Sequence, residues 1–146
     1  MTQAIITKNA KMVADIVLHA VESGAYEFIC VNFANPDMLG HTGNFEAGKA
    51  AVQTVDKEVE RILAKLLEVG GSGIITADHG NIEEMINLKT GEIDTEHSVN
   101  PVPVILVGKE YKDKHLKKGK LCDVAPTILK MMGVKQPEEM TGKPLF

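Results

Sequence analysis

The sequence lacks several features that would assign the protein to a specialised class. None of its apolar runs approaches the roughly 18 to 20 residues that a membrane helix needs, and no signal-peptide pattern is present at its start. Positive charge is not in excess, because the formal net charge is -4, and the lysine-rich run at 112–120 is interpreted as a solvated turn. We therefore expect a cytoplasmic protein that binds neither a membrane nor nucleic acid.

Cysteine is also scarce. The two cysteines, Cys30 and Cys122, show neither metal-binding nor redox spacing. We expect both to be small core residues in a protein from a reducing compartment.

What is present fits one globular α/β domain, or part of one. The chain has 146 residues, of which 44% are hydrophobic and 25% charged, values that are ordinary for a globular protein. Apolar spacing and turn residues predict helices at 9–23, 44–69 and 122–134 and strands at 27–33, 73–77 and 102–108. Along the chain the predicted order is helix, strand, helix, strand, strand, helix, which favours an α/β layered fold in which helices pack on the faces of a mostly parallel sheet.

Aspartate and histidine side chains gather where these strands begin or end. In open α/β sheets, loops that follow neighbouring strands converge at the carboxyl edge of the sheet, where ligands bind. We expect that convergence for Asp37 and His41 after the first strand, Asp78 and His79 after the second, and His97 before the third.

Two carboxylates and three imidazoles form a mixed oxygen and nitrogen ligand set, which suits Mn²⁺ or Zn²⁺ better than Ca²⁺. Each residue alone also has a structural interpretation: an Asx turn after Pro36 for Asp37, and an ordinary loop histidine for His41 or His97. Three such loops together favour a metal site. His19 and His115 lie elsewhere and are interpreted as structural or solvated.

Several longer strings carry a family resemblance. From about residue 10 to its end, the chain resembles the C-terminal segment of the cofactor-independent (2,3-bisphosphoglycerate-independent) phosphoglycerate mutases, which belong to the alkaline phosphatase superfamily. The strings are "NFANPDMLGHTGN", "TADHGNIEEM", "EHSVNPVPVILVG", "DVAPTIL" and "EEMTGKPL".

The resemblance implies two Mn²⁺ ions in the intact enzyme. Asp37, His41 and His97 match the ligands of the first ion, and Asp78 with His79 match ligands of the second. Residues 1–146 would then be the C-terminal part of the metal-binding phosphatase domain. The family's nucleophilic serine, a further aspartate ligand and the inserted transferase domain have no counterpart here.

The resemblance also implies the activity of the intact enzyme, which interconverts 3-phosphoglycerate and 2-phosphoglycerate through a phosphoserine. Because no catalytic nucleophile is assigned in this chain, we expect the chain alone to be inactive. Ser98, beside His97, is the best internal substitute, although the family gives that position no such role.

Two alternatives stay open: a non-catalytic metal-binding or interaction module, and another phosphatase or phosphopentomutase of the same superfamily. We further expect exposed sheet edges to cause self-association or pairing with a missing N-terminal part.

Overall fold

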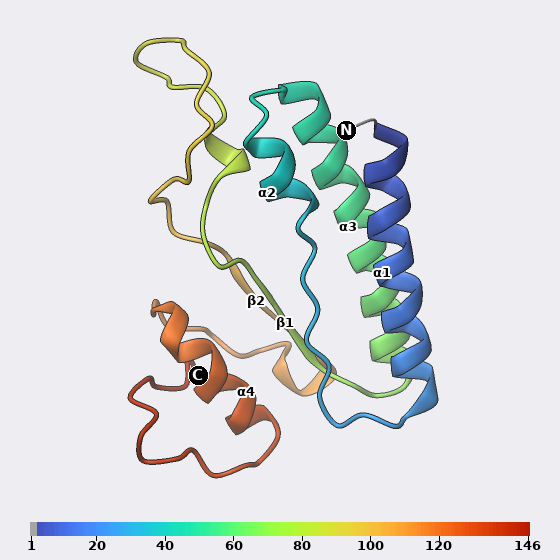
Figure 1. The fold of residues 1–146 in the computed structure, drawn as a ribbon. Helices are drawn as coiled ribbons and strands as arrows, with labels where there is room; N and C mark the ends of the chain where they lie inside the picture. Colours follow the sequence, from blue (N-terminus) through green and yellow to red (C-terminus); the bar gives the residue numbers. More distant parts are fainter. Residues whose placement is uncertain (1–2) are drawn as a thin grey trace.

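Two long parallel helices form one side of the molecule. The structure, a computed structural model, describes residues 3–146, with side chains described from residue 9 onward. Helices α1 (Gln3–Ser23) and α3 (Phe45–Glu68) lie side by side and run in the same direction (Figure 1). The predicted helices at 9–23 and 44–69 are therefore confirmed, and the Asn44 side chain caps α3 by accepting a hydrogen bond from the Ala47 N–H, at 3.0 Å.

A short helix replaces part of the predicted loop at 32–44. Helix α2 (Asn35–Gly40) begins with Pro36 in its first turn, where the missing N–H of proline costs no helical hydrogen bond. Proline at a helix start and glycine at a helix end are both compatible with one helical turn. Helix α2 packs against α3.

The sheet is smaller than predicted. Strand β1 (Gly73–Thr76) pairs with β2 (Val104–Val107) in antiparallel register, with Ile75 opposite Ile105. The α/β class is confirmed, but the sheet described here is not mostly parallel. Residues 27–33 run extended without a strand assignment, because a strand requires a hydrogen-bonded partner and none of the described residues supplies one.

The direction of these segments still produces the predicted convergence. The extended stretch before α2 and strand β1 both lead toward the end of the molecule at which α2 lies, and β2 starts from that end (Figure 1). The loops that leave or enter these three segments therefore meet there. Next to them lies the 3₁₀ turn η1 (Ile82–Glu84), which contacts α2.

The last part of the chain forms a separate lobe around α4 (Val124–Met131), which follows the 3₁₀ turns η2 (Lys109–Tyr111) and η3 (Leu121–Asp123). Asp123 directly precedes α4, and its carboxylate accepts the backbone N–H groups of Lys120 and Lys143, each at 2.8 Å. It therefore joins the C-terminal loop to the lobe, and its pKa is lowered by these backbone hydrogen bonds.

Burial is sparse for a chain of this length. The strands contain no fully buried residue, and the fully buried apolar side chains on the long helices are the small ones of Ala10, Ala14 and Ala51. Cys30 and Cys122 are both exposed, so the expectation that they lie in the core is wrong. The physical reason is local: Cys30 belongs to the unpaired extended segment, and Cys122 lies in a 3₁₀ turn at the surface.

Candidate metal centre

Helix α2 sets the spacing of the first two candidate ligands. Asp37 and His41 are separated by four residues, so one turn of helix brings them to the same face. The Nε2 atom of His41 lies 3.3 Å from Oδ1 of Asp37. The spacing of four in "PDMLGH" is thus explained by helical geometry.

The loop before β2 adds a third ligand-type side chain. The Nε2 atom of His97 lies 3.2 Å from Oδ1 of Asp37 and 3.1 Å from Nε2 of His41. Three atoms that can each donate a lone pair to a metal therefore meet around one point. The carboxylate Oδ1 of Asp37 is buried, yet no hydrogen bond from the described residues reaches it.

The tautomer of His41 follows from its other ring nitrogen. Nδ1 of His41 lies 2.7 Å from the backbone carbonyl oxygen of Thr95. Because a carbonyl oxygen only accepts, Nδ1 carries the proton, and in the neutral ring Nε2 presents its lone pair to the centre. A backbone carbonyl that fixes a histidine in this way is a common support of metal-ligating imidazoles.

The turn after β1 adds a second histidine ring. His79 stacks on His97, with 3.7 Å between ring centroids and an interplanar angle of 22°. One ligand-type atom from each of Asp37, His79 and His97 can be chosen so that all lie within 4.8 Å of one another. Asp78 extends into solvent, with a side chain that is 79% exposed, and its Oδ2 lies 3.7 Å from Nε2 of His79.

The donor set fits a divalent metal ion. Two imidazole nitrogens and a buried carboxylate oxygen lie 3.1 to 3.3 Å from one another, and the oxygen accepts no hydrogen bond from the described residues. A cation coordinated by all three would satisfy lone pairs that otherwise face each other.

Two further residues lie beside the candidate ligands and are not among them. Asn81, which is 6% exposed, places its side chain against Gly40, at the end of α2. Glu83 accepts hydrogen bonds from Ser98 Oγ, from the Asn81 backbone N–H at 2.8 Å and from Asn100 Nδ2 at 3.2 Å. Desolvation alone would raise the pKa of Glu83, but these hydrogen bonds lower it to about 2.

The structure therefore brings Asp37, His41, His97 and His79 together and leaves Asp78 at the solvent-exposed edge. His79 lies in the same group as Asp37, His41 and His97, so the division of the ligands between two ions stays a prediction. His19 and His115 are exposed and lie outside the group. Sequence reasoning did not single out Asn81 and Glu83, although both stand within the quoted "TADHGNIEEM" string.

Several phosphoglycerate mutases are similar to this chain in sequence. The chain is 55% identical over 138 residues to the 2,3-bisphosphoglycerate-independent phosphoglycerate mutase 2 of Methanosarcina barkeri, covering 94% of this chain and 26% of that protein. It is 52% identical over 139 residues to the corresponding mutase of Clostridioides difficile, covering 94% of this chain and 27% of that protein. The chain thus spans about a quarter of the length of the curated relatives it matches.

A solved structure shares the fold. Crystal structures of the phosphoglycerate mutase of Leishmania mexicana at low cobalt concentration include a chain that matches with a TM-score of 0.81 and 27% identity, over 94% of this chain and 28% of that one. The predicted resemblance and the partial α/β, alkaline phosphatase-like fold are therefore confirmed.

One family profile extends over most of the sequence. The profile described as the metalloenzyme superfamily matches residues 2–136, a range that contains every candidate ligand described above. The chain belongs to the metalloenzyme superfamily.

Proposed function

We propose that this chain supplies the greater part of a dimanganese centre in a 2,3-bisphosphoglycerate-independent phosphoglycerate mutase, an isomerase of glycolysis. Its residues 1–146 would correspond to the C-terminal part of the metal-binding domain of the longer relatives. The substrate would be phosphoglycerate and the location cytoplasmic. The observation that carries the proposal is the convergence of Asp37, His41 and His97 at 3.1 to 3.3 Å around a buried carboxylate oxygen that accepts no hydrogen bond.

Each residue has a distinct part in this proposal. Asp37, His41 and His97 would hold the first ion, and Thr95 would keep His41 in the tautomer that presents Nε2. Asp78 and His79 would contribute to the second ion. When bound, divalent cations neutralise phosphate charge and stabilise the oxygens that are exchanged during phosphoryl transfer.

The candidate ligands do not include a nucleophile. Ser98 is the nearest hydroxyl in sequence to His97, but its Oγ donates a hydrogen bond to Glu83. This bond favours a structural role for Ser98, and we expect the isolated chain to lack mutase turnover.

The site assignment is tested by calorimetric titration of the chain with Mn²⁺. Asp37→Ala removes the carboxylate at the centre, and we expect binding to weaken by about 10-fold or more, because each lost 1.4 kcal/mol is a factor of ten. The matched control is Asp56→Ala, which makes the same charge change at an exposed position of α3. Equal heats and affinities for the chain and Asp37→Ala would refute the assignment.

The catalytic part is tested separately by following 3-phosphoglycerate and 2-phosphoglycerate by NMR in the presence of Mn²⁺ and the purified chain. We expect no interconversion. If turnover occurs and disappears in Asp78→Ala, a nucleophile lies within these residues and the proposed division of labour is wrong. Mn²⁺ binding without turnover also describes a non-catalytic module, so this alternative is distinguished by restoring the remaining part of a mutase and measuring activity.

A further inference from the structure

A single carboxylate joins the two loops that carry His79 and His97. Glu83 lies in η1, after the turn that contains His79, and its Oε2 accepts the Asn81 backbone N–H at 2.8 Å. Its Oε1 accepts Ser98 Oγ and, at 3.2 Å, Nδ2 of Asn100. We call Glu83, Ser98 and Asn100 the carboxylate clasp.

The backbone around the clasp leaves room for it. The Ser98 N–H donates to the carbonyl oxygen of Gly80 at 2.9 Å, so the two loops already meet as an isolated antiparallel bridge. A Cβ at Gly80 would overlap with Ser98 Oγ and with Glu83 Oε1, and it would lie 3.2 Å from Glu83 Cδ. Only glycine at this position allows the serine and the carboxylate to meet beside the bridge.

The clasp acts next to the candidate metal centre and is not among its metal-ligand candidates. Ser98 directly follows His97, whose ring stacks on His79 at 3.7 Å and whose Nε2 lies 3.2 Å from Asp37. His97 is partly exposed, with 47% of its side chain accessible, so surrounding packing restrains the ring only in part. The position of this ring therefore depends on how its loop is anchored.

We propose that Glu83 is a positioning residue for the metal centre, holding the loop at Ser98 and Asn100 so that the His97 ring stays stacked on His79 and within reach of Asp37. The metal-related part of this proposal rests on the proposed function above. The positioning of the ring concerns the chain itself and is measurable without metal.

A carboxylate is suited to this task because both of its oxygens accept, and here three donors reach them. Hydrogen bonds to an ionised acceptor are also stronger than those between neutral groups. Glutamine at this position has one acceptor oxygen, so its NH₂ group would face at least one of the three donors. Glu83→Gln thus keeps the size of the side chain and removes the function of the clasp.

The matched control is Glu84→Gln. It makes the same charge change one residue away. The Glu84 carboxylate accepts only the Asn100 side chain among the clasp residues, at 2.9 Å, and the one acceptor oxygen of glutamine can keep that single hydrogen bond. A general effect of charge near the histidines would appear in both variants. An effect of the clasp would appear in Glu83→Gln alone.

The first readout is NMR of the metal-free chain with isotope-labelled histidine, in which stacked rings at 3.7 Å give a nuclear Overhauser effect between His79 and His97. We expect this signal in the unmodified chain and in Glu84→Gln, and its loss in Glu83→Gln. The second readout is titration with Co²⁺, whose visible absorption reports its ligands. Here we expect Glu83→Gln to bind about 10- to 100-fold more weakly, as for other residues that support metal ligands, and Glu84→Gln to bind within about twofold of the unmodified chain.

The outcomes separate the two proposals. If Glu83→Gln keeps the ring signal and the Co²⁺ affinity of the control, the positioning role is overturned while the metal centre stands. If no variant binds Co²⁺ but the ring signal is lost in Glu83→Gln alone, the metal assignment fails and the positioning role stands. If the amide spectrum of Glu83→Gln loses its dispersion, the variant is unfolded, and Ser98→Ala is used in its place. This substitution removes one donor of the clasp and keeps the carboxylate. An unchanged ring signal and an unchanged Co²⁺ affinity in Ser98→Ala would overturn the positioning role.

Discussion

At the scale of single residues, we expect the geometry of the candidate metal centre to depend on a position that carries no side chain. The Asn81 amide lies against the backbone of Gly40, where α2 ends. It therefore links the end of α2, where Asp37 and His41 lie, to the turn that follows His79. We therefore expect Gly40, which has no ligand atom of its own, to limit how closely the candidate ligands approach one another.

Gly40→Ala tests this contact. The added Cβ would lie 2.6 Å from Asn81 Cγ and closer still to its Oδ1, so α2 or the turn must shift. Because the ligands come from both, we expect divalent metal binding to weaken by about tenfold or more, measured by calorimetry with Mn²⁺.

Gly91→Ala is the control for the glycine substitution. A Cβ at Gly91 meets nothing within 4 Å, although the backbone φ of +72° disfavours alanine there. We expect this variant to keep the metal affinity and to lose only a small amount of stability. Unchanged affinity in Gly40→Ala would show that the contact with Asn81 does not set the ligand geometry.

The ligand-type residues could be identified from the sequence because their chemistry is local and their loops follow or precede apolar segments. The clasp could not, since Glu83 and Ser98 are 15 positions apart and only the fold brings them together. No local pattern distinguishes Glu83 from Glu84. The four-residue spacing of Asp37 and His41 after Pro36 was a usable helical signal that the neighbouring Gly and Asn residues obscured.

At the scale of elements, α1 and α3 are held together by small side chains and ion pairs. Ala10 and Ala14 of α1 are fully buried. Arg61 of α3 donates to Asp15 at 2.8 Å, and Lys65 lies 3.5 Å from Glu22. These pairs are solvent-exposed and contribute little to stability, so we assign the stability of the helix pair mainly to the close packing of its small residues.

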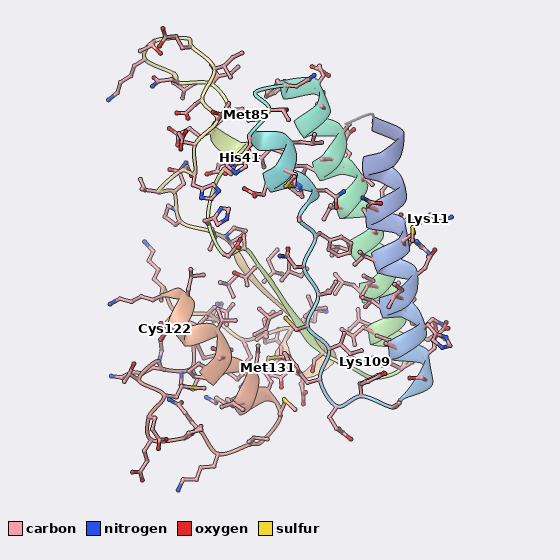
Figure 2. The ribbon with its side chains drawn as sticks, in the orientation of Figure 1. Lys11, His41, Met85, Lys109, Cys122 and Met131 are labelled. Atoms are coloured by element: carbon pink, nitrogen blue, oxygen red, sulfur yellow. The ribbon has the colours of Figure 1, made fainter. Side chains whose placement is uncertain are left out.

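Ala14→Leu tests that packing. Inserting three carbon atoms at a position with no accessible surface forces the helices apart, and we expect the free energy of unfolding to fall by about 1–3 kcal/mol, measured by urea denaturation. Lys11→Leu is the control, because Lys11 points away from α3 on the same helix (Figure 2). An equal stability for Ala14→Leu and the unmodified chain would show that the interface is loosely packed.

Elements that local sequence signals determine were predicted correctly, whereas the strand pairing was not. The long helices have a clear 3.6-residue period, α3 also has a capping asparagine, and both helices form as predicted. Strand pairing is set by partners distant in sequence, so neither the antiparallel pairing of β1 with β2 nor the unpaired state of residues 27–33 was readable from composition. None of the helices in the described part of the chain combines the length and apolar character needed to cross a lipid bilayer.

At the scale of the whole molecule, the accessible surface is large for the length of the chain. It measures 10224 Å², whereas a folded monomer of this size exposes about 7300 Å². Large apolar side chains contribute to the surplus, and they include Phe28 of the extended segment and Ile105 of β2, which are 52% and 50% exposed. A sheet of two half-buried apolar strands also offers unpaired edges to another chain.

We therefore predict that the chain self-associates at micromolar concentration, measured by light scattering and sedimentation. The surplus of roughly 2900 Å² exceeds the roughly 800 Å² per partner that a standard interface buries, so a dimer does not require rearrangement of the fold.

Ile105→Lys places a charge on the apolar sheet and should shift the population toward monomer. Val134→Lys makes the same kind of change after α4, at a residue that is 48% exposed, and should leave association unchanged if the sheet is the interface. A clean monomer in the unmodified chain would contradict the prediction, and an equal effect of both variants would place the association outside the sheet.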